Sequence, residues 1–324
     1  MKKIIAGMLA LVMLFAFMFT GASFAEEKKI SVVTTIFPVF DWARAVAGDD
    51  GNVDITMLLD SGVDLHSYQP TAQDIMKVAT CDVFVYVGGE SDEWVEGALA
   101  EAINPDMVVV NLLEALGDDV KEEEIVEGME AGEEEEEGEE EEVEYDEHVW
   151  LSLRNAEKLV KVLADALGQA DPDRADAYAA NTAAYADQLS ALDAEYAAAV
   201  ESADFDTLLF GDRFPFRYLT DDYGLNYYAA FVGCSAESEA SFETIVFLAG
   251  KVDELGLSAV MTIEGDNHRI AETIVENTRA RDARVLAMDS MQATTGEDVK
   301  NGVTYLGVME GNLEALKRAL SQNG

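Results

Sequence analysis

Positive charge is scarce in this sequence. Lysine and arginine together number 21, against 65 aspartates and glutamates, and the formal net charge is −44. A surface with this balance repels the phosphates of nucleic acids and anionic lipids, so the composition argues against both as partners. It favours cations as ligands or high solubility, and it is also compatible with a salt-adapted environment.

Cysteine is scarce too, because the chain has only Cys81 and Cys234. Their spacing does not match a zinc-finger pattern. Export from the cytoplasm would permit a disulfide between them. However, Cys81 lies in an apolar strand pattern and Cys234 follows a distant strand-like run. We therefore predict two buried free thiols.

Beyond the N-terminus, the sequence has no second apolar run that could cross a bilayer. The first run, IIAGMLALVMLFAFMFT, follows Lys2 and Lys3 and precedes the small-residue site SFA at residues 23–25. This order predicts a signal peptide over residues 1–25 and an extracytoplasmic protein. The alternative is an uncleaved anchor, although 17 apolar residues lie at the short limit for a span. No cysteine follows the run, so we expect no lipid attachment.

The rest of the chain alternates strand patterns with helical patterns, which is typical of α/β folds with mainly parallel sheets. We predict two such lobes, each with its sheet flanked by helices, joined by one long rigid helix over residues 171–203. The first lobe covers residues 26–170 and the second covers 204–324. Asp171 is expected to cap the long helix, with Pro172 in its first turn. The expected strands are ISVVTT, VDITMLL, CDVFVYVGG, DMVVVNL, TLLFGD, LNYYAAF, AVMTIEG and RVLAMDS.

One segment of the first lobe is too acidic to be buried. Residues 121–147 carry 17 acids and one lysine. Like charges at this density resist compaction, so residues 117–146 are predicted to form a mobile surface loop. The run ends at His148. It is interpreted either as an electronegative arm that concentrates cations near that histidine or as a solvated spacer.

Only three histidines occur, and two of them lie where strand-end loops should converge. His66 lies in a loop after a strand pattern, and His148 precedes VWLSL. Any single histidine is more often a cap or a surface residue than a ligand. Imidazole combined with carboxylate nevertheless suits a divalent metal such as zinc. Asp212 and Asp289 both follow apolar strand runs and could supply the carboxylates, or they could be caps or turn residues.

A series of motifs resembles the zinc/manganese-type solute-binding proteins of ABC importers, the cluster A-I class. Each motif is weak, but together they cover almost all of the mature chain in order. They are VVTTIFPVFDWARAVAG, LLDSGVDLHSYQPTAQDI, DVFVYVGGESDEWVE, DEHVWLSLRNA, LDAEY, FRYLTDDYGL, GCSAESEAS and VTYLGVMEGNL. The resemblance implies two α/β lobes bridged by a long helix, with the metal in the cleft between them.

The resemblance also implies metal ligands. His66 and His148 match the first two ligands of the family, and Asp289 matches the fourth. The third position, three residues before the phenylalanine of the F-x-Y motif, is occupied by Arg213, which has no lone pair to offer. Either Asp212 replaces it, which is the interpretation adopted here, or three protein ligands act with water; Glu264 is an alternative. Arg213 is then expected to pair with an acid such as Asp289 or Glu264.

The function implied is that of a non-enzymatic receptor, a monomer that captures Zn²⁺ and delivers it to an ABC permease. Mn²⁺ becomes more plausible if both remaining ligands are carboxylates. A secreted zinc-dependent hydrolase is a competing hypothesis, but the sequence has no H-E-x-x-H motif. A cation buffer or surface adhesin is a third hypothesis, and it predicts that deletion of residues 121–144 removes most bound metal. The long helix predicts only small closure of the lobes.

Overall fold

The computed structural model describes residues 29–49, 51–130, 144–235, 239–265 and 267–322. The predicted signal peptide and residues 131–143 of the predicted loop lie outside these ranges. Within them, no helix is both long and apolar enough to cross a membrane.

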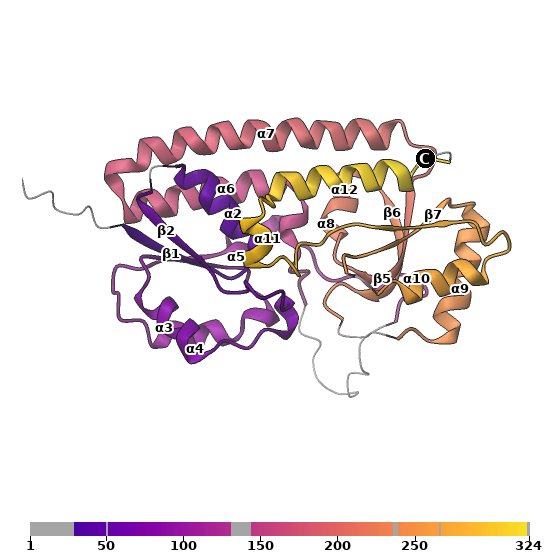
Figure 1. The fold of residues 1–324 in the computed structure, drawn as a ribbon, viewed down its shortest axis with the longest axis horizontal. Helices are drawn as coiled ribbons and strands as arrows, with labels where there is room; N and C mark the ends of the chain where they lie inside the picture. The colour runs from indigo at the N-terminus through magenta and orange to yellow at the C-terminus, as the bar shows by residue number, and fades with distance from the viewer. Residues whose placement is uncertain (1–28, 50, 131–143, 236–238, 266, 323–324) are drawn as a thin grey trace, which may run out of the picture.

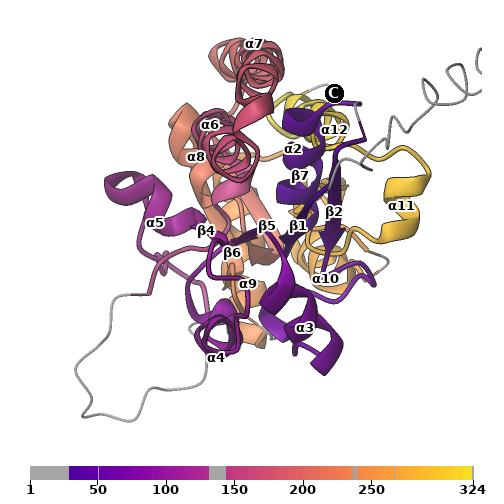
Figure 2. The same cartoon turned by 90° about the vertical axis from the view of Figure 1, so that its left-hand side faces the viewer.

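The first lobe contains a parallel four-stranded sheet in the order β2-β1-β3-β4. Its helices include α3, which begins with a capping box between Thr71 and Asp74. Two helices, α2 and α6, pack on one face of the sheet, and α3 and α4 lie on the other side (Figure 2). The elements are β1 (Ile30–Thr34), α2 (Phe37–Ala47), β2 (Val53–Met57), α3 (Ala72–Thr80), β3 (Val83–Tyr86), α4 (Trp94–Ala100), β4 (Val108–Asn111), α5 (Leu112–Leu116) and α6 (Leu153–Ala170).

The second lobe repeats this architecture with a parallel sheet in the order β6-β5-β7-β8. Helices α9 and α10 pack against this sheet, and α12 contacts β7 and β8. All eight strands expected from the sequence are present. The elements are β5 (Thr207–Phe214), α8 (Arg217–Tyr223), β6 (Asn226–Val232), α9 (Phe242–Leu255), β7 (Ala259–Thr262), α10 (Arg269–Asn277), β8 (Arg284–Ala287), α11 (Gly296–Lys300) and α12 (Tyr305–Ala319).

The long helix is α7 (Ala175–Glu201), which runs over both lobes (Figure 1). Its 27 residues correspond to a length of about 40 Å. Asp171 and Pro172 occupy the expected N-cap and first-turn positions, but of a 3₁₀ turn that precedes the helix, and the Asp171 side chain makes no capping bond. The turn covers Pro172–Arg174, and the Asp171 carboxylate accepts hydrogen bonds from Arg174 and Tyr178 side chains instead.

A second helix also joins the lobes. Helix α12 lies beside α7 (Figures 1 and 2) and contacts α2 of the first lobe as well as the second sheet. Its first residue, Tyr305, packs edge-to-face on Trp42 with 5.1 Å between ring centroids. The Tyr305 hydroxyl donates to the Trp150 carbonyl at 2.6 Å, and the Trp150 indole donates to the Ser290 carbonyl at 2.8 Å. One buried apolar core therefore continues from lobe to lobe.

The described ends of the acidic segment differ from the predicted mobile loop. Glu122 and Tyr145 form an antiparallel bridge, and the Asp146 amide donates to the Lys121 carbonyl at 2.9 Å. Further on, Glu130 forms a parallel bridge with Phe231 of β6. These bonds satisfy backbone groups of the segment, and the bond from the Glu130 amide to the Ala230 carbonyl attaches it to β6. The acidic segment is thus fixed at both described ends.

Candidate metal centre

His66 lies in the loop that follows β2, in a 3₁₀ turn over Leu65–Ser67. Leu65 is buried and fixes the turn to the core. The Asp64 carboxylate caps the turn by accepting the His66 amide at 3.0 Å. The local sequence D-L-H therefore sets the direction of the imidazole through a cap and an apolar contact.

His148 immediately precedes a second 3₁₀ turn, Val149–Leu151, and its side chain is fully buried. One oxygen of Asp146 accepts the His148 amide at 2.8 Å and lies 3.0 Å from its Nδ1. Such a carboxylate holds Nδ1 protonated, which leaves the Nε2 lone pair available to a ligand. Asp146, at the end of the acidic run, thus orients the histidine beside it.

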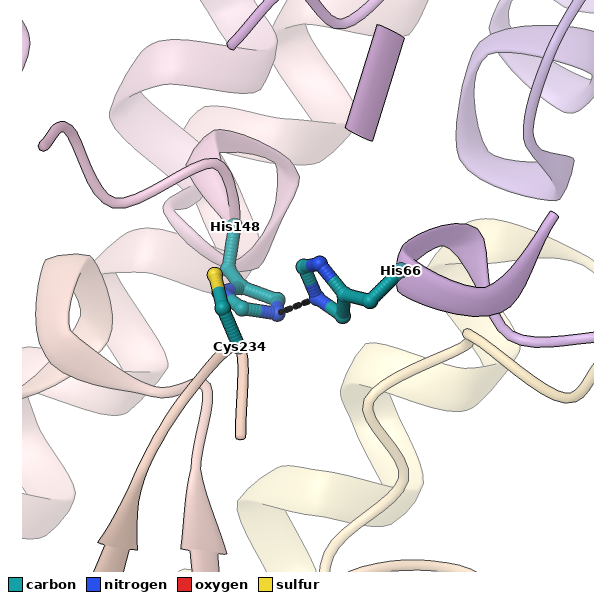
Figure 3. Close-up of side chains that lie close together, drawn as sticks. All are labelled: His66, His148 and Cys234. Carbon is teal, nitrogen blue, oxygen red and sulfur yellow. Dashed lines mark hydrogen bonds between the residues drawn. The ribbon is translucent and has the colours of Figure 1, made fainter. Parts of the chain in front are cut away.

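The two histidines face each other through their Nε2 atoms, which lie 3.1 Å apart (Figure 3). On the far side of the His66 ring, Nδ1 lies 2.8 Å from the Ser91 hydroxyl. Two nitrogens of a tetrahedral zinc site, each 2.0–2.1 Å from the metal, are separated by about 3.3 Å. The observed separation therefore already matches one edge of such a site.

The protonation of the pair follows from its surroundings. Burial, followed by the charge of His148, lowers the pKa of His66 to about 3, so its ring is neutral at neutral pH. Burial opposes a charge on His148 as well, but the Asp146 carboxylate outweighs it and raises the His148 pKa. The neutral His66 ring offers a lone pair, and the second histidine carries any proton that the pair shares.

Cys234 joins this pair, which the sequence did not predict. Among the described residues, His66, His148 and Cys234 offer donor atoms that all lie within 4.8 Å of one another. Figure 3 shows the sulfur beside the His148 ring, on the chain that leaves β6. Both cysteines are free and Cys81 is buried, as predicted, but Cys234 is only partly buried. The sequence signal for it was its place after a glycine at the end of a strand.

The Cys234 thiol has an acidic environment. Burial, followed by the charge of Glu123, raises its pKa above the usual range of a thiol. Glu147 and Asp146 add to the effect. The thiol is therefore protonated in the metal-free protein.

Arg213 pairs with an acid, as expected, but that acid is neither Asp289 nor Glu264. Its guanidinium forms an ion pair with Asp64, the residue that caps the His66 turn. The two are 149 residues apart in the chain and belong to different lobes. Asp64 thus both positions His66 and connects the first lobe to the second.

Asp212 lies in β5 at a register shift between Phe210 and Arg213. Its Oδ2 accepts the Thr262 hydroxyl at 2.6 Å and the Ile263 amide at 3.3 Å, and its Oδ1 accepts the Arg213 amide at 2.9 Å. The structure places Asp212 in a hydrogen-bonded contact with β7, outside the group of donor atoms around the histidines.

Asp289 follows β8, next to the Ser290 carbonyl that binds Trp150. Its Oδ1 accepts the Met291 amide at 2.7 Å. Burial and the charge of Glu264 raise the pKa of Asp289 to about 6. Glu264 itself accepts the Ser290 amide and hydroxyl, both at 2.7 Å, which fixes the loop after β8. Neither acid belongs to the donor group around the histidines.

The third histidine is separate from the pair. His268 precedes α10, and its Nδ1 lies 3.3 Å from the Thr262 hydroxyl. It therefore provides a natural control for substitutions at the other two histidines.

A hollow of about 380 Å³ reaches His66 and Cys234 and is lined mainly by acids. Several carboxylates facing one hollow concentrate cations within it, because the surrounding protein focuses their field. The hollow therefore offers an electrostatic route for a cation towards His66 and Cys234. Its lining consists of His66, Glu90, Ser91, Glu93, Glu123, Glu144, Tyr145, Glu147 and Cys234.

Comparisons with known proteins agree on one family. The model of the family described as zinc-uptake complex component A, periplasmic, matches residues 32–319. The zinc-binding lipoprotein AdcA of Streptococcus pneumoniae is 32% identical over 300 residues, which cover 92% of this chain and 57% of AdcA. The chain thus spans less than two thirds of that relative. The high-affinity zinc uptake system protein ZnuA of Bacillus subtilis is 29% identical over 302 residues, covering 93% and 90% of the two chains.

A solved structure shows the same fold. The crystal structure of the Zn(II)-bound ZnuA-like domain of Streptococcus pneumoniae AdcA has a TM-score of 0.70 and 29% identity to this chain. The match covers 91% of this chain and 100% of that domain. The two-lobe architecture predicted from the sequence is therefore confirmed.

Proposed function

The chain belongs to the family of periplasmic zinc-uptake components, and we propose that it captures Zn²⁺ outside the cytoplasm and passes it to an ABC permease. Family membership assigns an extracytoplasmic location and a non-enzymatic metal-binding role. The zinc-binding names of the relatives support zinc as the cargo. Residues 1–25 are proposed as the export signal, and the protein is proposed to act as a monomer.

One observation carries this proposal: the two Nε2 atoms lie 3.1 Å apart, with the far nitrogen of each ring near a hydroxyl or carboxylate. This is the arrangement of two imidazoles that are oriented to share one metal. Nitrogen donors favour Zn²⁺, whereas Mn²⁺ prefers carboxylate and water. His66 and His148 are therefore the proposed nitrogen ligands.

Of the two predicted carboxylate ligands, we favour Asp289 over Asp212. Both oxygens of Asp212 already accept hydrogen bonds, so coordination would break contacts with β7. For Asp289, the bonds found among the described residues use only Oδ1. Its second oxygen could bind metal without losing such a bond, and its backbone adjoins the Ser290 carbonyl held by Trp150.

Calorimetric titration of chelator-stripped protein with Zn²⁺ and with Mn²⁺ tests the function. One tight zinc site is expected, with weaker binding of manganese. His66→Ala/His148→Ala should abolish the tight site, whereas the control His268→Ala should retain it. Weak, multiple zinc binding that is unchanged in the double variant would contradict the receptor function. It would leave the acidic run as a cation buffer.

The same titration distinguishes the carboxylates. Asp289→Asn should weaken zinc binding at least tenfold, which corresponds to about 1.4 kcal/mol. Asp212→Asn should retain zinc affinity. Because it weakens a hydrogen-bond acceptor, it should lower the free energy of unfolding by about 1 kcal/mol. The reverse pattern would identify Asp212 as the ligand.

A further inference from the structure

Both histidines belong to the first lobe, so a site shared between the lobes needs a donor from the second. Among the described residues, the only second-lobe side chain in the donor group is Cys234. It enters from below in Figure 3, from the chain that leaves β6, whereas His148 enters from above and His66 from the right. The thiol therefore stands where the second lobe meets the pair.

The backbone before Cys234 is built for this approach. A Cβ on Gly233 would lie 2.9 Å from Cε1 of His148 and 3.0 Å from the Phe214 carbonyl. Any side chain here would push the strand end away from the imidazole. Glycine lets the chain pass directly against the ring, and the next residue then places its sulfur beside the ring.

Apart from Asp289, the second-lobe groups considered as ligands or pairing partners are engaged elsewhere. Arg213, at the expected third position, is cationic and pairs with Asp64. Asp212 is bonded to Thr262, and Glu264 is bonded to the loop after β8. A sulfur donor would therefore fill the ligand position that arginine leaves vacant.

On the basis of the proposed function, we propose that Cys234 is a zinc ligand and makes the site selective for soft transition metals. The zinc–sulfur bond forms as the S–H proton leaves to water, with no change in oxidation state. Zinc accepts two imidazoles and a thiolate readily, with bonds of about 2.0–2.1 Å to nitrogen and about 2.3 Å to sulfur. Thiolate favours Zn²⁺ strongly over Mn²⁺, so the cysteine excludes the harder ion.

Binding requires a small contraction of the observed cluster. Sulfur and nitrogen on one tetrahedral zinc lie about 3.5 Å apart, given those bond lengths. The donor atoms now lie within 4.8 Å of one another. Cys234 is only partly buried and adjoins the acid-lined hollow, so its side chain has room to turn towards the metal.

Cobalt(II) substitution tests this proposal, because a thiolate bound to Co²⁺ produces a sulfur-to-metal charge-transfer band in the near ultraviolet. The proteins compared are the unsubstituted chain, Cys234→Ser and the control Cys81→Ser, with thiols kept reduced. Cys81 is buried and its sulfur lies near the Val78 carbonyl and the Met107 sulfur, away from the histidines. Zinc and manganese titrations of the same three proteins measure selectivity.

The band is expected in the unsubstituted protein and in Cys81→Ser, and it should be absent in Cys234→Ser. Cys234→Ser should still bind one zinc, at least tenfold more weakly, with a smaller preference for zinc over manganese. Cobalt bound tightly at the His66–His148 site without the band would overturn the proposal and leave the receptor function intact. Failure of the unsubstituted protein to bind zinc or cobalt would overturn both proposals.

Discussion

At the scale of single residues, Arg213 is the most informative departure from the family pattern. A fixed positive charge lies where the resemblance leads us to expect a metal ligand. Its effect is visible on His66, whose pKa is lowered by burial, by His148 and also by Arg213. Repulsion between the guanidinium and an incoming divalent cation must therefore weaken binding, although the Asp64 pair compensates part of the charge.

We predict that Arg213→Gln strengthens zinc binding by about tenfold, or about 1.4 kcal/mol, measured by competition with a chelating dye. Removal of the cation also leaves the Asp64 charge uncompensated near the metal. Arg217→Gln is the matched control, because Arg217 pairs with Glu124 of the acidic segment instead. Weaker binding in Arg213→Gln would mean that the arginine matters more as a clamp between the lobes than as a repelling charge.

At the scale of elements, the turn that follows β3 holds Ser91 beside His66. Asp92 is almost fully buried, and its Oδ2 accepts the amides of Val87 and Gly88 at 2.9 and 3.0 Å. This turn positions Ser91, whose hydroxyl lies beside His66. Burial raises the pKa of Asp92 to about 6, even though the two amide bonds act in the opposite direction.

The raised pKa predicts the direction of a pH effect on stability. An unfolded aspartate loses its proton near pH 4, whereas folded Asp92 keeps it to about pH 6. Between these values the folded state binds more protons, so the stabilising contribution is complete below pH 4 and is lost as pH rises to 6. Asp92→Asn should remove this loss, which amounts to about 3 kcal/mol in the free energy of unfolding.

The measurement is denaturant unfolding of metal-free protein and of Asp92→Asn at several values between pH 4 and 7. Other carboxylates contribute to the slope in both proteins, so the difference between the two curves isolates Asp92. The variant should gain stability relative to the unsubstituted chain as pH rises. A constant difference over the whole range would show that Asp92 titrates alike in the folded and unfolded states.

The elements themselves were predictable from sequence, whereas the contacts between distant loops were not. Alternating apolar strands and amphipathic helices depend on local pattern, so the strands and α6 could be predicted directly. The motifs also pointed to His66 and His148. The Arg213–Asp64 pair and the place of Cys234 depend on how two lobes meet, which no local pattern records. From the sequence, Cys234 was predicted to be a buried free thiol, because the residues that surround it in space are remote from it in the chain.

At the scale of the whole molecule, the lobes are joined more firmly than one helix would allow. Helices α7 and α12 both contact the two lobes, and Tyr305 links Trp42 to the carbonyl of Trp150. Bending across this region would break buried hydrogen bonds and open a packed core that continues between lobes. Metal capture should therefore proceed through movements of loops and side chains.

We predict that the radius of gyration changes by less than about 1 Å when zinc binds, as measured by small-angle X-ray scattering of stripped and loaded protein. A rigid pair of helices confines the change to the loops that carry His66 and Cys234, and such local shifts hardly alter the mass distribution. The His66→Ala/His148→Ala variant, measured with and without zinc, controls for cations that bind the acidic surface and alter its hydration. A change of several ångströms in the unsubstituted protein alone would show that α7 and α12 act as a hinge.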